Sequence, residues 1–175
     1  TYDFGTSGML YKSDLVMYDR QTHSLWSQME GRAIVGDLAG SRLTMLPANT
    51  LAYGEWKRLY PGGKVLSKDT GHFRSYGRNP YDGYDEPSSH PFLYFDKVDR
   101  RLPPKERVAG VLIGDGARAY PFGLLATRKV VADTLGGQPL VVFFRPGTLS
   151  ALDRSVIAQS KDIGATAVWS PVVDG

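Results

Sequence analysis

The stretch DLVMYDRQTHSLWSQ, residues 14–28, contains two short segments with apolar residues, separated by a polar turn. Leu15 and Met17 follow the two-residue spacing of a strand that buries one face. The polar residues between the two segments are typical of a tight connection. The stretch therefore predicts a hairpin, with strands over residues 14–18 and 24–28, inside an antiparallel sheet.

Other short strands are expected on either side of this hairpin and beyond it. Alternating apolar residues bounded by glycine or polar turns predict strands over residues 31–36 and 42–46. Together with the hairpin they would make residues 1–46 a single antiparallel sheet. A further strand is expected over residues 64–67.

One segment of the first half has helical rather than strand spacing. A helix is expected at about residues 50–60, where apolar residues recur on neighbouring helical rows. Asn49 or Thr50 is expected to cap its start, and Pro61 to end it. Trp56 is expected to anchor this helix on the sheet.

The strand pattern resumes from about residue 105. A hairpin is expected from residues 107–113 and 117–120, because an Asp-Gly dipeptide between apolar runs favours a tight turn. Pro121 is expected to begin a helix that continues to Val130. The other expected elements are a strand over residues 139–144, a short helix over 151–160 and a strand over 165–169.

The composition agrees with a turn-rich β protein. The chain has 20 glycines and 11 prolines among 175 residues, nearly 18%, against roughly 12% in average usage. We therefore expect an α+β, mainly β fold: an antiparallel sheet with short helices and a long aromatic Gly/Pro-rich loop. The expected division is a β-rich half over 1–68, the long connection over 69–104 and a second β-rich half over 105–175, either as one domain or as part of a longer chain.

Charge and composition exclude several classes of function. The formal net charge is only +3 and the two signs are interleaved, whereas a nucleic-acid-binding protein usually carries a basic stripe, so no nucleic-acid partner is expected. There is no cysteine, which excludes disulfides and cysteine-ligated metals. No stretch approaches the ~20 apolar residues of a transmembrane segment. A periplasmic or other extracytoplasmic location is preferred.

Three long motifs identify a family resemblance. They are FGTSGMLYKSDLVMYDRQT over residues 4–22, SLWSQ followed by GRAIVG within 24–36, and YGRNPYDGYDE over 76–86. Together they resemble the family known as domain of unknown function 3179, and the resemblance covers most of the chain. The family carries no established activity, so the resemblance implies a fold and leaves the function open.

The resemblance also bears on metal and redox roles. In many members of that family, the segment similar to residues 107–143 leads into a Cys-x-x-Cys element. Residues 144–152 of this chain read FRPGTLSAL instead, which puts a metal or redox role of this segment in doubt. The order of the motifs implies a piece of a longer, duplicated chain, in which a cysteine pair would precede Thr1.

Two residues are candidates for catalysis. Asp69 belongs to an Asp-Thr-Gly tripeptide of the kind that supplies the carboxylates of aspartic proteases, and His72 follows it. The tripeptide occurs once, whereas such a protease needs two. An enzyme or a metal- or redox-linked protein, with a site at Asp69 and His72 or in sequence outside this chain, is therefore the alternative hypothesis.

A cation site is a further hypothesis. Asp82, Asp85 and Glu86 lie within five residues in a Gly- and Tyr-rich loop, and calcium takes carboxylate and carbonyl oxygens from such loops. The spacing differs from that of an EF-hand. Solvated acidic side chains are the competing interpretation.

The same loop is the leading candidate for a binding surface. Tyrosine rings stack on sugars and peptides while their hydroxyl groups remain hydrated, and arginine adds charged hydrogen bonds. We therefore expect a non-catalytic binding module for a protein, peptide or saccharide ligand, although the loop could instead pack on its own sheet. The candidate binding residues are Arg74, Tyr76, Arg78, Tyr81 and Tyr84.

Overall fold

The computed structural model describes residues 1–46 and 48–172, and it divides into two compact units. The first unit combines Thr1–Ala48 with Ser89–Pro104, and the second combines Asn49–Ser88 with the chain from Lys105 on. Both contain antiparallel strands, and the short helices of the described residues lie in the second unit, which together confirm the expected α+β, mainly β class. The long connection of residues 69–104 is divided between the two units.

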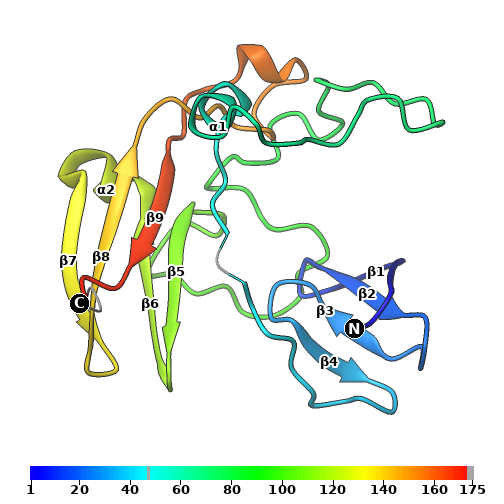
Figure 1. The fold of residues 1–175 in the computed structure, drawn as a ribbon. Coiled ribbons are helices and arrows are strands. Elements are labelled where there is room, and N and C mark those ends of the chain that lie inside the picture. Colours follow the sequence, from blue (N-terminus) through cyan, green and yellow to red (C-terminus); the bar gives the residue numbers. More distant parts are fainter. Residues whose placement is uncertain (47, 173–175) are drawn as a thin grey trace. The chain divides into compact units, whose positions relative to one another are not determined.

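The first unit contains a four-stranded meander in which each strand pairs with the next (Figure 1). The hairpin expected around residues 14–28 is present, with Met17 opposite Trp26. Val16, Trp26 and Ala33 are buried on this sheet. The strands are β1 (Phe4–Tyr11), β2 (Asp14–Asp19), β3 (Leu25–Ser27) and β4 (Arg32–Val35).

The strand expected over residues 42–46 is wrong. The chain makes only an isolated bridge there, between Arg32 and Arg42. Met45 and Leu46 are both exposed, so the apolar alternation has no core to face. Without burial of one face, alternation alone does not sustain a strand.

The second unit contains a hairpin and a three-stranded sheet (Figure 1). They share one core, because β5 contacts β9 and β6 contacts β7, and helix α2 (Phe122–Arg128) adds Leu125 to it. The hairpin is β5 (Val108–Ile113) with β6 (Gly116–Pro121), and the sheet is β7 (Val130–Leu135), β8 (Gln138–Arg145) and β9 (Ala165–Trp169). The expected hairpin and the last two strands are confirmed.

The two helices expected in this half are shorter than predicted. Lys129 has a φ of 64°, which ends α2 before Val130, and Val130 is the first residue of β7 instead of the end of a helix. Because Val130 is β-branched, it favours the strand. The helix expected over residues 151–160 is only a 3₁₀ turn, η1 (Ile157–Gln159).

The helix expected at about residues 50–60 is present as α1 (Tyr53–Leu59), but its predicted contacts are wrong. The residue before it is Ala52, without a side-chain cap, so neither Asn49 nor Thr50 caps it. Trp56 does not anchor α1 on a sheet: its ring packs between Tyr53 and Tyr60 and against Gly63. Glu55 instead ties α1 to β8 by an ion pair with Arg145.

The chain between α1 and β5 has no helix and no named strand (Figure 1). The strand expected over residues 64–67 is therefore wrong, and the exposed Val65 and Leu66 explain why, since neither reaches a core. Among residues 1–46 and 48–172, no helix combines the length and the apolar character that crossing a bilayer requires.

Candidate functional site

The middle of the aromatic loop, residues 69–104, is tied to the connection between β8 and β9, residues 146–164. The buried Asn79 donates its backbone N–H to the Ser155 carbonyl (2.9 Å), and its side-chain amide donates to the Arg154 carbonyl (3.4 Å). Its side-chain oxygen accepts from the Tyr81 N–H (2.8 Å). The Gly83 N–H donates to a further carbonyl of the same connection. These bonds fix the loop backbone where it carries no secondary structure of its own.

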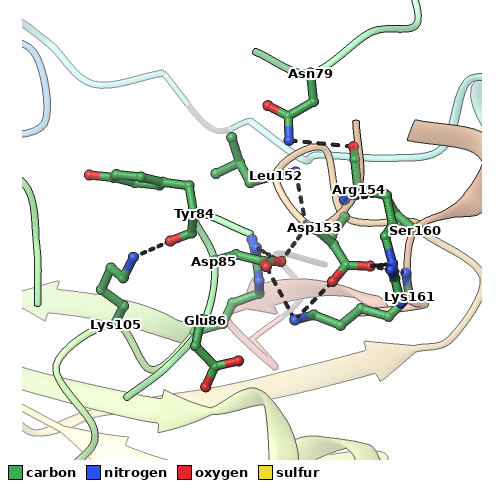
Figure 2. Close-up of polar contacts among 12 residues, drawn as sticks. Asn79, Tyr84, Asp85, Glu86, Lys105, Leu152, Asp153, Arg154, Ser160 and Lys161 are labelled. Atoms are coloured by element: carbon green, nitrogen blue, oxygen red, sulfur yellow. Dashed lines mark hydrogen bonds and ion pairs between the residues drawn. The ribbon is translucent and has the colours of Figure 1, made fainter. Parts of the chain in front are cut away.

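Asp85 joins the loop to the same connection through its side chain (Figure 2). The carboxylate is only 7% exposed, accepts a hydrogen bond from the buried Ser150 hydroxyl, and lies 3.1 Å from Lys161 Nζ and 3.7 Å from Arg107 Nη2. Burial raises the pKa of Asp85, but the hydrogen bonds from Ser150 and Lys161 and the charges of Lys161 and Arg107 outweigh it, so the pKa is lowered. Asp85 is therefore a charged anchor of the loop.

Lys161 lies between two carboxylates. Besides Asp85, its Nζ is 3.5 Å from Asp153 Oδ1, and its backbone N–H donates to Asp153 Oδ2 (2.8 Å). Burial lowers the pKa of Lys161, but these two acidic partners have the greater effect and raise it. The ammonium group is thus held charged between the loop and the connection.

Three of the five candidate binding residues line one open surface depression. It has a volume of about 570 Å³ and is lined by Arg74–Pro80, including Arg74, Tyr76 and Arg78. Tyr81 and Tyr84 are not among its lining residues. Arg74 and Arg78 are exposed, and so is about half of Tyr76.

Tyr81 and Tyr84 form a separate pair. Their ring centroids are 6.0 Å apart, and Lys105 Nζ lies 4.2 Å from the Tyr84 ring centroid and donates to the Tyr84 carbonyl. Tyr84 is half-buried, whereas Tyr81 is exposed. Tyr84 therefore contributes to packing of the loop, next to the depression in sequence but apart from its lining.

The three acidic candidates for a cation site do not converge. The Asp85 carboxylate is already occupied by Ser150, Lys161 and Arg107, and Figure 2 shows the Glu86 carboxylate directed away from it. Glu86 accepts instead from the Ser88 hydroxyl (2.9 Å). Across the described parts of the chain, no group of three or more His, Cys, Asp or Glu residues is arranged to hold a metal ion. The geometry gives the calcium hypothesis, which included Asp82, no support.

The candidate catalytic residues lie in an exposed turn. The Asp69 N–H donates to Ser67 Oγ (3.0 Å), and the Thr70 hydroxyl donates to the His72 carbonyl (3.5 Å). Both Asp69 and His72 are exposed. These are local turn contacts, and they do not place the Asp69 carboxylate against the His72 ring.

A second buried polar centre lies in the first unit. Asp19 is fully buried, and its carboxylate accepts from Trp26 Nε1 (2.9 Å) and from the Thr22 N–H (2.6 Å) and hydroxyl. The Thr22 hydroxyl also contacts Ser24 Oγ (2.7 Å). Burial raises the pKa of Asp19, yet the donors from Trp26 and Thr22 hold it below its usual range. The centre is closed to solvent and holds the β2–β3 turn on the sheet.

Comparison with known protein families identifies the family of this chain. The sequence model of the family described as Protein of unknown function (DUF3179) matches residues 1–174. The chain belongs to this family. No curated protein and no solved structure matches the chain. In this DUF3179 chain, residues 76–86, one of the motifs that suggested the family, are the part of the loop that is tied to the β8–β9 connection.

Sequence reasoning did not find the residues that hold the DUF3179 loop in place. Ser150, Lys161 and Arg107 are far from Asp85 in sequence, and no local motif marks them. Asp162 was also missed: its carboxylate accepts from three backbone N–H groups in the β8–β9 connection, which lowers its pKa. Only the Asn79-Pro80 dipeptide, a typical turn sequence, gave a local signal.

Proposed function

We propose that this chain is a non-catalytic binding module and that its contact surface is the depression lined by Arg74–Pro80. One observation carries the proposal: the aromatic loop is anchored at Asn79 and Asp85, while Arg74, Tyr76 and Arg78 lie at the open surface. The proposed ligand is a protein, peptide or saccharide. The preference for an extracytoplasmic location stays a prediction of the sequence.

The anchoring supports binding because it reduces the entropy that a ligand must overcome. A loop without helix or strand normally loses conformational freedom when it binds. Here Asn79 and Gly83 already hold the backbone through bonds to the β8–β9 connection. The exposed side chains next to these bonds therefore start from a fixed backbone.

The exposed side chains are of the types that dominate binding energy. Tyrosine and arginine are enriched among the few residues that carry most of the affinity at interfaces. Tyr76 has two rotatable side-chain torsions and a large ring, so it offers contact area at low entropic cost. Arg74 and Arg78, on either side of it in sequence, offer charged hydrogen-bond donors.

The test is a screen of the labelled protein on peptide and glycan arrays, repeated with Tyr76→Ala. We expect a ligand whose signal falls at least about tenfold in Tyr76→Ala, since truncating a central aromatic contact commonly costs more than about 1.4 kcal/mol. Tyr53→Ala is the matched control, because Tyr53 is an exposed tyrosine of the same unit outside the loop. Equal losses in both variants, or no ligand that depends on Tyr76, would contradict the proposal.

A second measurement separates contact from packing. Tyr81→Ala and Tyr84→Ala are compared with Tyr76→Ala by thermal unfolding. Since Tyr76 is half exposed, we expect its truncation to leave the unfolding temperature nearly unchanged. If Tyr76→Ala unfolds the protein, the loop is structural and the proposal fails.

A further inference from the structure

Arg74 and Arg78 differ from most arginines of this protein because no described carboxylate pairs with them. Eight other arginines form ion pairs within the described residues. Arg42, Arg100 and Arg128 also lack an ion pair among these residues, but none of them lines the depression. Of the arginines without an ion pair among the described residues, Arg74 and Arg78 line one depression together.

The segment that carries these two arginines contains no acidic residue. From Thr70 to Tyr81 the chain has no Asp or Glu, and the seven residues that line the depression include none. The nearest acidic residues in sequence, Asp69 and Asp82, lie outside this lining. No acidic residue that lines the depression therefore neutralises the two arginines.

The backbone beneath the arginines is held in place. Arg78 forms an isolated bridge with Val156, and its N–H donates to the Ser75 carbonyl (3.2 Å). The Tyr76 N–H donates to the Arg74 carbonyl (3.0 Å). The Arg78 backbone is thus tied to the β8–β9 connection, whereas that of Arg74 has a local turn contact. Each guanidinium group can present parallel N–H donors to a carboxylate, which is the geometry of a bidentate pair.

We propose that the depression binds an acidic peptide segment, with Arg74 and Arg78 pairing with its carboxylates and the Tyr76 ring contacting the peptide between them. This inference rests on the proposed function and adds the class of ligand. Charge complementarity supports it, since two arginines without an ion pair among the described residues line a depression that no acidic residue lines.

The shape of the site favours a peptide over a small anion or a nucleic acid. The depression is open and follows seven consecutive residues, so it offers a surface for an extended chain instead of an enclosure for one ion. A nucleic-acid-binding surface would need a broad basic stripe, whereas this chain carries +3 with both signs interleaved.

The experiment measures fluorescence anisotropy of a fluorescein-labelled short peptide of Glu, Ser and Gly, against the same peptide with Gln in place of Glu. We expect the Glu peptide to bind and the Gln peptide to bind at least about tenfold more weakly. The double variant Arg74→Gln with Arg78→Gln should lose at least about tenfold in affinity for the Glu peptide.

The matched control is Arg100→Gln with Arg128→Gln, which removes the same charge from two exposed arginines that also lack an ion pair among the described residues. We expect a change of less than about twofold, because screened charges outside the contact affect binding weakly. An equal loss in both double variants would show a general charge effect and overturn the inference.

The remaining outcomes separate this inference from the proposed function. If the arrays yield a Tyr76-dependent ligand while the Glu and Gln peptides bind equally or not at all, the binding module stands and the acidic peptide is wrong. If a single-stranded oligonucleotide or inorganic phosphate displaces the Glu peptide at lower concentration than unlabelled peptide does, the ligand class is wrong. If no ligand depends on Tyr76, both proposals fail.

Discussion

Asp19 in the first unit is fully buried and the Asp85 side chain in the second is 7% exposed. Both have lowered pKa values, but they are stabilised in different ways. Neutral donors surround Asp19, chiefly Trp26 and Thr22. Asp85 has the cations Lys161 and Arg107 in addition to Ser150. A buried carboxylate can thus be kept charged by hydrogen bonds alone or by ion pairs.

The two aspartates also differ in how far their partners lie along the chain. The partners of Asp19 are within seven residues, so its centre holds one turn on one sheet. The partners of Asp85 come from separate segments, so its network joins the loop to the β8–β9 connection and to the start of β5. The first arrangement stabilises a local motif, and the second positions a distant segment.

The largest effect is expected for Trp26→Ala in the first unit. Trp26 is 1% exposed, and its truncation removes a buried ring and the Nε1 donor to Asp19. We expect a loss of about 3–5 kcal/mol in the free energy of unfolding, measured by urea titration. Trp169→Ala is the control, because Trp169 is more than half exposed. A smaller loss for Trp26 than for Trp169 would contradict the closed core of the first unit.

A smaller effect is expected for Asp85→Ala. Lys161 and Arg107 are each more than a third exposed, so solvent partly replaces their lost partner. We therefore expect a loss of about 1–2 kcal/mol in the free energy of unfolding, which is less than the cost of breaking a fully buried pair. The effect should be local, with faster hydrogen exchange at the Asn79 and Gly83 amides. Asp82→Ala is the matched control from the same loop. Unchanged exchange at both amides would show that Asp85 does not anchor the loop.

Much of the fold could be predicted from the sequence because its strands depend on local signals. The hairpin of residues 14–28 and the Asp-Gly hairpin of β5 and β6 have alternation and turn residues within one short stretch. The predictions were wrong where tertiary packing determines whether a segment forms a strand or where a helix ends. The apolar residues of 42–46 and 64–67 are mostly exposed and meet no core, and Lys129 ends α2 with a left-handed backbone that no propensity marks.

Less of the candidate site could be predicted. Composition and spacing pointed to the aromatic loop, but did not separate Tyr76, which lines the depression, from Tyr84, which packs under Lys105. The ion-pair network could not be found at all, because Ser150 and Lys161 reach Asp85 only through the fold. Local sequence identifies a turn, whereas long-range charge pairing requires the three-dimensional arrangement.

Acid is expected to destabilise both units. Asp133 of β7 is ion-paired with Arg118, whose hydrogen bond lowers the pKa of this carboxyl. Because the pKa values of Asp19, Asp85 and Asp133 are lower in the folded state than the unfolded value near 3.9, the folded protein binds fewer protons. The stability they contribute is complete above about pH 5 and is lost as the pH falls through the folded pKa values, about 2 for Asp133. Urea titrations between about pH 2 and 6 should show this, and stability that rises on acidification would contradict it.

Salt should affect the pKa values of Asp19 and Asp85 differently. The carboxyl pKa values of Asp19 and Asp85 are followed by NMR at low salt and at about 1 M NaCl, where the Debye length is about 3 Å. We expect the pKa of Asp85 to rise towards its usual value, since its partly exposed cations are screened, and that of Asp19 to stay nearly constant. Equal shifts of the two pKa values would remove the distinction between neutral and ionic stabilisation.

The smallest effect on stability is expected where arginines have no partner. Arg74→Gln with Arg78→Gln should change the free energy of unfolding by less than about 0.5 kcal/mol, because neither side chain is buried or ion-paired among the described residues. Arg107→Gln is the contrasting variant: it removes a cation next to the largely shielded Asp85 side chain and should lower the free energy of unfolding by about 1 kcal/mol, since its guanidinium is partly solvated. If the double variant proved the more destabilising, Arg74 and Arg78 would be structural like Arg107, and the positive charge of the depression would serve the fold. If the double variant is the less destabilising of the two, the charge of Arg74 and Arg78 contributes little to folding, as expected of residues that bind a ligand.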